Sequence, residues 1–380
     1  NSGRGGSGCA YFFAAGNDRD TDDLTDYDSY RAYRWVVSVA ALDRNGIVTY
    51  YSTPGNNVMI SAPGGEFSTA GIVSTDRTGA PGYSPSGDSY TAVDDGLQGT
   101  SFASPIVAGA AAVLFDARPD LTWRDMQHIM IDSARETGSG YTFNSSGRRF
   151  SRDYGFGLLD LSAAIDLAEE WVLVPPNASP LFSEGDLTTQ QQIPEGSTVG
   201  VQDTTTIEAD PSFFTEHVEL SIDVSHPDCN EVEYHLTSPS GTTMIIPARV
   251  DFPYEIEDLD FTFTFWGFWG ENPSGEWQLR VIDRKANNQG TLNDWSLRVR
   301  GYEGGDTTGV RKVITNVTGT AMVHVGDTGV QLTIFGSGFN SSSIVTWNGQ
   351  PLQTTYVDPS MLTARVPDHF VQTIGDAEIR

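Results

Sequence analysis

The sequence has few basic residues, few cysteines and no long apolar run, and each shortage excludes a class of protein. Acidic residues outnumber basic ones by 50 to 22, which gives a formal net charge of -28. Such a chain repels phosphate backbones and anionic membranes, so we expect cations and basic peptides as partners, and no nucleic acid. The two cysteines, Cys9 and Cys229, have neither disulfide-framework nor metal-ligand spacing. No apolar run is long enough to span a bilayer, and the first residues lack the pattern of a signal peptide.

Residues 1–172 have the pattern of an α/β domain. The continuous apolar runs at 9–16 and 35–42 are typical of strands that are buried on both faces of a parallel sheet. Three helical patterns follow, at residues 103–117, 121–134 and 160–171. The second of them begins with Thr122 and Asp125, which form a variant capping box.

The rest of the chain has the patterns of two all-β domains. Pro, Ser, Thr and Gln dominate residues 173–194, which indicates a linker. From 195 to 303 apolar and polar residues alternate, which predicts half-buried antiparallel strands and a sandwich or jelly roll. A second linker at 304–311 precedes short strands in residues 312–380, where Asn348 and Gly349 form a hairpin turn. We predict an immunoglobulin-like sandwich there, which stops before such a fold is complete.

The segment LQGTSFASPIVAG, residues 97–109, places Ser101 between a small-residue turn and an apolar helix. A serine in that place can simply be a helix cap. Its neighbours favour a nucleophile: Gly99 lets the backbone approach closely, and Pro105 stands near the first turn, where a missing N–H costs least. At the helix start Ser101 also meets the positive end of the helix dipole and can lend its own N–H to an oxyanion.

These residues resemble the subtilisin-like serine proteases. Residues 99–105, GTSFASP, are similar to the nucleophile motif of that family, and Asn17, at the end of FFAAGN, resembles its oxyanion-hole asparagine. The resemblance implies that the side-chain amide of Asn17 and the backbone N–H of Ser101 bind the oxyanion together. It also implies that the parallel sheet carries helices on both faces and that the domain is present only in part.

The resemblance narrows to the kexin and furin branch. The stretches at 2–17 and 121–134 are similar to segments of those convertases, and residues 195–303 resemble their jelly-roll P domain. Residues 312–380 resemble the IPT/TIG domain, an immunoglobulin-like module of cell-surface proteins.

One part of the family's site has no counterpart here. A subtilase uses Asp, His and Ser in that chain order, with the Asp and the His ahead of the asparagine. The six histidines all follow Ser101: His128, His217, His226, His235, His324 and His369. Asp94 and Asp95, just before the motif, read as a solvent-facing loop. We expect the triad Asp and His in a missing upstream segment. The alternatives are a truncated sequence and a base replaced by one of these histidines; residues 1–380 alone are expected to be inactive.

Six aspartates gather between residues 18 and 28. They can form a plain solvated loop, but a hard cation such as Ca²⁺ would relieve their repulsion. The resemblance to furin-like enzymes implies that Asp23 is a calcium ligand and that Asp28 is the floor of the pocket for the residue before the scissile bond. Asp28 would select Arg or Lys there. Thr53 stands where those enzymes have a third carboxylate ligand.

Together these features predict a secreted or surface-displayed serine endopeptidase that cleaves after Arg or Lys and contains structural calcium. Its partners would be protein or peptide substrates with basic residues, and the IPT/TIG module would contact a cell or wall surface. The alternative is a non-catalytic adhesion or scaffold protein in which a protease-like remnant is structural.

Overall fold

The computed structural model describes residues 3–84, 86–92, 96–169, 171–185, 190–286, 288–304, 313–318, 327–337, 339, 343, 345–348, 350–358, 360–371 and 379. The chain divides into two compact units. The first contains Asn1–Asn144 and Arg149–Thr308, and the second contains Ser145–Arg148 and Gly309–Arg380. The first unit therefore combines the α/β segment with the long β-rich segment that follows it.

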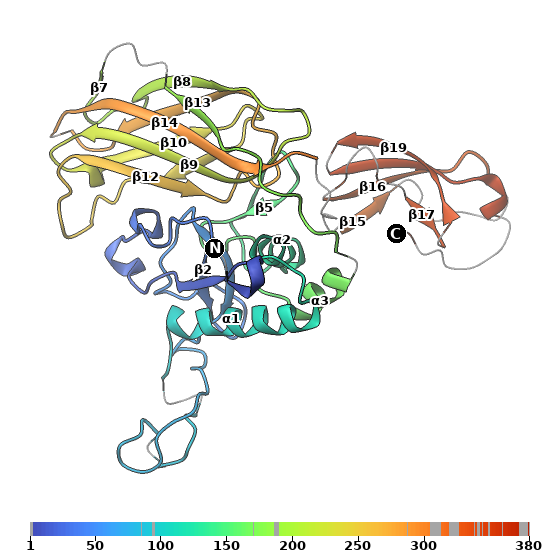
Figure 1. The fold of residues 1–380 in the computed structure, drawn as a ribbon, viewed down its shortest axis with the longest axis horizontal. Coiled ribbons are helices and arrows are strands. Elements are labelled where there is room, and N and C mark those ends of the chain that lie inside the picture. Colours follow the sequence, from blue (N-terminus) through green and yellow to red (C-terminus); the bar gives the residue numbers. More distant parts are fainter. Residues whose placement is uncertain are drawn as a thin grey trace. The chain divides into compact units, whose positions relative to one another are not determined.

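The α/β segment is built on a parallel sheet with the order β1-β2-β3. Figure 1 labels β2 of this sheet and the three helices of the segment. The strands are β1 (Tyr11–Ala14), β2 (Val36–Leu42) and β3 (Val58–Pro63). Helix α1 (Thr100–Ala117) contacts all three strands, and α2 (Trp123–Ser133) and α3 (Leu161–Glu169) contact α1 and each other. The α/β class predicted from the sequence is confirmed. A short hairpin, β4 (Thr142–Phe143) with β5 (Arg149–Phe150), completes this part.

Helix α1 is a core helix. Its buried residues are spaced by three or four along one face, and that face joins the main hydrophobic core: Ala103, Val107, Ala111 and Leu114. By length and composition alone α1 could also cross a membrane. One face of α1 packs against the three strands, where its small residues let it lie close to them, and Ile106 and Val113 are among its exposed residues.

Strand β1 differs from the prediction that both strands are buried on two faces. Every residue of β2 is buried, whereas β1 alternates between exposed and half-buried residues. Tyr11 and Phe13 are 45% and 38% exposed. The reason is position: among the described strands β1 pairs only with β2, so it forms the edge of this sheet.

The β-rich segment forms two packed antiparallel sheets, as predicted. One has the order β11-β10-β13-β8 and the other β12-β9-β14-β6, with β7 also paired to β14. Their bounds are β6 (Leu181–Glu184), β7 (Gln191–Ile193), β8 (Val201–Ile207), β9 (Phe214–Ser225), β10 (Val232–Thr237), β11 (Thr243–Ile246), β12 (Leu259–Phe265), β13 (Gly275–Asp283) and β14 (Gly290–Tyr302). Two of these strands, β6 and β7, come from the predicted linker at 173–194. This segment is rich in Ser and Gln and has few apolar residues, so its sequence did not predict strands. The backbones of β6 and β7 nevertheless pair with β14.

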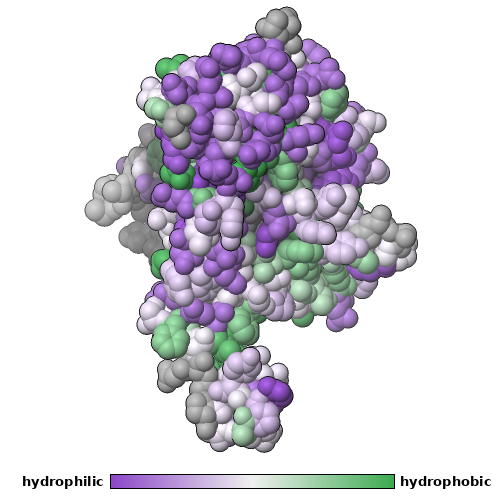
Figure 2. Space-filling model, turned by 90° about the vertical axis from the view of Figure 1, so that its left-hand side faces the viewer, coloured by the Kyte–Doolittle hydropathy of each residue, from purple (hydrophilic) through white to green (hydrophobic). Residues whose placement is uncertain are grey.

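The α/β segment and the sandwich share one hydrophobic core. The backbone N–H of Trp266 donates to the Asn56 carbonyl oxygen at 3.1 Å, and its indole N–H donates to the Asn57 carbonyl oxygen at 3.1 Å. The Asn56 amide in turn donates to the Ile245 carbonyl oxygen at 2.9 Å. On the face that Figure 2 shows, hydrophilic residues cover most of the upper part of the molecule, where the sandwich lies. Trp266 and Trp269 are buried at this junction, where Trp269 packs on His128 and Phe156 of the α/β segment.

The second unit is a small β-fold with a sheet of order β15-β16-β20-β19 and a hairpin β17-β18. Its strands are β15 (Val313–Thr318), β16 (Gln331–Ser337), β17 (Thr346–Trp347), β18 (Gln350–Pro351), β19 (Gln353–Asp358) and β20 (Met361–Arg365). At the predicted hairpin turn Asn348 has a positive φ of 48°; Gly349 lies outside the described residues. Asp94 and Asp95 also lie outside the described residues, and so does the predicted linker 304–311 apart from Gly304.

Candidate active site

Ser101 and Asn17 meet at the start of helix α1. Asn17 follows β1, and Ser101 is the second residue of the helix, with its side chain exposed to solvent. Gly99, the residue before the helix, has a φ of 145°, a conformation that favours glycine. A β-carbon on Gly99 would lie 3.7 Å from the amide atoms of Asn17 and 3.7 Å from the backbone nitrogen of Ser101. The missing side chain thus leaves a small volume between two groups that can donate hydrogen bonds.

The orientation of the Asn17 amide follows from its contacts with Thr100. The Thr100 backbone N–H donates to Asn17 Oδ1 at 2.9 Å, and the Thr100 hydroxyl donates to the same oxygen at 2.9 Å. That hydroxyl also accepts the Gly16 N–H at 3.2 Å. Because a backbone N–H can only donate, the atom that faces it must be the oxygen. The NH₂ group of Asn17 is then directed away from Thr100 and has no hydrogen-bond partner in the described part of the chain.

Tyr51 holds the backbone ahead of the helix in place. Its hydroxyl accepts the Gly99 N–H at 2.9 Å and donates to the Gly65 carbonyl oxygen at 2.6 Å. Tyr51 is buried, and burial raises the pKa of its hydroxyl, so the group stays a neutral donor and acceptor. Gly99, two residues before Ser101, is therefore held by a side chain from a different loop.

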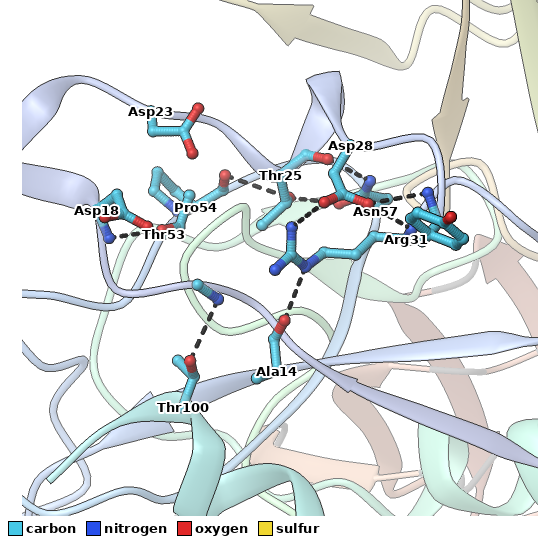
Figure 3. A network of polar contacts seen from close by, with 12 residues as sticks. Ala14, Asp18, Asp23, Thr25, Asp28, Arg31, Thr53, Pro54, Asn57 and Thr100 are labelled. Carbon is cyan, nitrogen blue, oxygen red and sulfur yellow. Dashed lines mark hydrogen bonds and ion pairs between the residues drawn. The ribbon is translucent and has the colours of Figure 1, made fainter.

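Asp28 does not present a free carboxylate. Its Oδ2 is 2.5 Å from Nη1 of Arg31, and its Oδ1 accepts the backbone N–H groups of Tyr30 and Arg31 at 2.9 and 3.0 Å. The Nε–H of Arg31 donates to the Ala14 carbonyl oxygen at 2.7 Å (Figure 3). Asp28 thus lies near the end of β1 that carries Asn17, but its charge is balanced within the chain.

Asp23 lies beside Asp18 and is paired with an arginine of the sandwich. Its Oδ1 is 3.1 Å from Nη1 of Arg249. Burial raises the pKa of the Asp23 carboxyl, and the negative charge of Asp18 adds to this rise, while Arg249 opposes it. The Thr53 hydroxyl accepts the Asp18 N–H at 3.0 Å. Carboxylate and hydroxyl oxygens are the ligands that Ca²⁺ takes, but these three groups are fewer than its usual six to eight and one of them already pairs with Arg249.

A second acidic cluster lies in the sandwich, where the carboxylates of Glu231 and Asp283 come within 4.8 Å of the His226 ring. All three residues are buried. His226 Nδ1 accepts the Asp228 N–H at 3.0 Å, so the proton of a neutral ring is on Nε2, which faces Asp283 Oδ2 at 3.4 Å. A metal would need a lone pair on that same nitrogen, and Lys285 already lies 3.3 Å from Glu231. The cluster therefore does not fit a metal ion.

The described histidines have other contacts and do not offer a base to Ser101. His128 is fully buried in α2, with Nε2 at 2.8 Å from Glu216 Oε1. The remaining described histidines pair with acidic residues of the sandwich or, in the second unit, contact a neighbouring aromatic ring edge to face: His217, His226, His235 and His369. His324 is outside the described residues.

Comparison with known proteins agrees with this architecture. The Subtilase family matches residues 1–157, the Proprotein convertase P-domain matches 215–299, and the IPT/TIG domain matches 313–378. Proprotein convertase subtilisin/kexin type 6 of Rattus norvegicus is 31% identical over 321 residues, which cover 79% of this chain and 32% of the relative. Furin of Homo sapiens is 30% identical over 308 residues, which cover 79% of this chain and 37% of the relative. The chain thus spans about a third of the length of these relatives.

A solved structure shows the same fold. The serine protease of Aeromonas sobria, in its complex with the chaperone ORF2, superposes with a TM-score of 0.70 at 24% identity. The match covers 78% of this chain and 65% of that one. The family matches thus place a Subtilase segment, a Proprotein convertase P-domain and an IPT/TIG domain in this order along the chain, and 79% of the chain is similar to furin-type convertases.

Several residues of the site were not predicted from the sequence. Thr100 stands inside the recognised motif, but its bonds to Asn17 and Gly16 depend on the fold. Arg31 follows Asp28 by three residues, a spacing that could have suggested an ion pair. Tyr51 and Arg249 carry no local signal, because their partners are far away in the sequence.

Proposed function

We propose that this chain carries the nucleophile part of a serine endopeptidase that cleaves peptide bonds after Arg or Lys. Ser101 Oγ attacks the scissile carbonyl carbon, and the electron pair of the C=O π bond moves to the oxygen. The Asn17 NH₂ group and the Ser101 N–H bind that oxyanion. The hydroxyl proton of Ser101 passes to a histidine, and Asp28 binds the basic side chain of the substrate.

The observation that carries the proposal is the volume beside Gly99. Two donors from distant parts of the chain border it, the Ser101 N–H and the Asn17 NH₂ group, and the two bonds from Thr100 to Asn17 Oδ1 direct that NH₂ group away from Thr100. A simple helix cap does not need this arrangement, since the cap would require only an oxygen near the first backbone N–H groups.

The proposal takes the histidine and the triad aspartate from outside residues 1–380. A base must come within hydrogen-bond reach of Ser101, and each described histidine is engaged elsewhere. On this basis residues 1–380 alone bind but do not turn over substrate.

The test uses the protein that includes the missing base. A fluorophosphonate should label Ser101, and Ser101→Ala should abolish both the labelling and the cleavage of Arg-containing peptides. Asn17→Ala should lower kcat by about 10²–10³-fold, the usual effect of removing one hydrogen-bond donor from an oxyanion hole. Ser68→Ala, which removes an exposed hydroxyl that donates to Glu66, is the matched control and should change neither readout.

The alternative function, a non-catalytic adhesion or scaffold protein, predicts the opposite. A folded protein that contains the upstream Asp and His, yet is neither labelled at Ser101 nor active on basic peptides, would establish it. Secretion or surface display, and contact of the IPT/TIG domain with a surface, are parts of the proposal that both functions share.

Calcium belongs to the proposal as a structural ligand, with Asp23 and Asp18 as its carboxylates. It supplies positive charge between two repelling groups and takes no part in bond cleavage. Because Arg249 already neutralises part of Asp23, we expect weak binding, with Kd of about 10⁻⁴–10⁻³ M. Millimolar Ca²⁺ should raise the melting temperature of the chain, and Asp23→Asn should remove that rise. An equal rise in Asp23→Asn and in the parent would exclude this site.

A further inference from the structure

Arg31 stands where the proposed function places the basic side chain of a substrate. The inference rests on that function, because Asp28 is there the group that binds Arg or Lys. We propose that Arg31 is a specificity-determining residue: its guanidinium is an internal occupant of the Asp28 site and competes with an incoming basic side chain.

Arg31 is held by two acceptors that lie in different parts of the chain. Nη1 pairs with the Asp28 carboxylate at 2.5 Å, and the Nε–H donates to the carbonyl oxygen of Ala14, the last residue of β1, at 2.7 Å. An exposed i,i+3 ion pair alone would be an ordinary surface contact of little weight. The second bond is different, since it fixes the guanidinium plane against the strand that leads to Asn17.

The guanidinium also lies close to the backbone next to Asn17. A β-carbon on Gly16 would stand 3.8 Å from Nη2 of Arg31. Figure 3 shows the Arg31 side chain reaching from its loop toward Ala14, past the carboxylate of Asp28. The cation therefore lies between the acidic loop and the end of β1, next to the backbone of Gly16.

The acceptor capacity of Asp28 is largely used. Its Oδ1 accepts two backbone N–H groups and its Oδ2 accepts the Arg31 guanidinium. A second guanidinium could share this carboxylate only against the repulsion of the first. An incoming Arg or Lys must therefore displace Arg31 from Asp28, and that displacement weakens the binding of basic side chains.

Displacement is possible because the pair is only partly buried. The side chains of Arg31 and Asp28 are 21% and 32% exposed. Water can solvate the released guanidinium, so Arg31 lowers affinity without closing the site. Substrates that bind only through one basic side chain should therefore bind weakly. Substrates that also contact other parts of the protein should lose less of their affinity.

The experiment measures binding of benzamidine, an aromatic amidinium, to the 380-residue chain by calorimetry. Arg31→Met keeps most of the side-chain volume and removes the charge, and it should bind benzamidine about tenfold more tightly than the parent chain. Arg44→Met, which removes the same charge from an exposed turn after β2, should bind like the parent. The double variant Arg31→Met with Asp28→Asn should lose the gain.

A second variant and a second readout guard against misfolding. Arg31→Lys keeps the charge but cannot bridge Asp28 and Ala14 as the fork does, so its affinity should fall between those of the parent and Arg31→Met. In the unsubstituted chain, the NMR signal of the Arg31 Nε–H should move in proportion to bound benzamidine.

The outcomes separate the two proposals. If Arg31→Met binds no better than the parent while Asp28→Asn weakens binding, Asp28 keeps its proposed role and the competition by Arg31 is wrong. If benzamidine binds neither chain, or binds both regardless of Asp28, the basic pocket itself is wrong and the role of Arg31 is lost with it. An Arg31 Nε–H signal that stays fixed while benzamidine binds would also overturn the competition.

Discussion

The side chain of Thr100 connects Asn17 to the start of the helix that carries Ser101. It is fully buried, and its hydroxyl bridges Asn17 Oδ1 and the Gly16 N–H. Thr100→Val keeps the shape of the side chain but leaves the Gly16 N–H without its acceptor and Asn17 Oδ1 with only the backbone N–H of residue 100. We expect the free energy of unfolding to fall by about 1–3 kcal/mol, measured by urea unfolding of the 380-residue chain.

Thr100→Ser is the control for this change, because it keeps the hydroxyl and removes only a methyl group. In Thr100→Val the NMR signals of the Asn17 side-chain amide should also shift, and in Thr100→Ser they should stay. A valine variant as stable as the parent, together with a destabilised serine variant, would mean that the methyl group matters and the hydroxyl does not.

The sequence indicated which residue types belong to the site but not what holds them. Asn17 and Ser101 could be chosen because each stands in a recognisable local motif. The roles of Arg31, Arg249 and Tyr51 were not predicted, because each contacts a group that only the fold brings close to it. Asp28 shows the consequence: the resemblance implied a carboxylate that binds a basic side chain of the substrate, and in the fold this carboxylate pairs with Arg31.

In helix α2, too, the local contacts could be predicted from the sequence and the long-range contacts could not. Its capping box, Thr122 with Asp125, was predictable because both bonds are local, and the structure confirms it. Asp125 has a second role that is not local. Its other oxygen accepts the indole N–H of Trp171 at 2.9 Å and the N–H of Val174 at 2.7 Å. The carboxylate that caps the helix thereby fixes the chain that leaves α3 for the sandwich.

Strands were predictable where their own side chains are buried. The apolar run of β2 and the alternation along β9, β10, β13 and β14 gave the correct element types. β6 and β7 were missed, because they add to the edge of a sheet through their backbones and need few apolar residues. The exposure of β1 was missed because it depends on which neighbours the strand has.

Across the whole first unit, Glu216 connects the α/β segment to the sandwich. It belongs to β9 and binds Arg124 and His128 of α2, with Nη2 of Arg124 at 2.7 Å from Oε1. Burial alone would raise the pKa of the Glu216 carboxyl, but the hydrogen bond from His128 and the charge of Arg124 outweigh it and lower the pKa to about 2.

A pKa that is lower in the folded chain makes this contact sensitive to acid. The stabilisation is fully present above the usual value of 4.5 and is lost as the pH falls from there toward about 2. Glu216→Gln should therefore cost about 3 kcal/mol in the free energy of unfolding at pH 7. The difference from the parent should shrink as the pH is lowered through this range. Urea unfolding at a series of pH values measures it; a difference that is constant with pH would contradict the charged contact.

The core that α2 and the sandwich share limits how this protein can evolve. Trp266 bonds to the backbone of residues 56 and 57, and Trp269 packs on His128 with ring centroids 4.5 Å apart. Recombination between genes within residues 173–194 would bring together halves whose aromatic and charged side chains had never been selected against each other. We therefore expect the α/β segment and the sandwich to keep their stability only when they are exchanged as a pair.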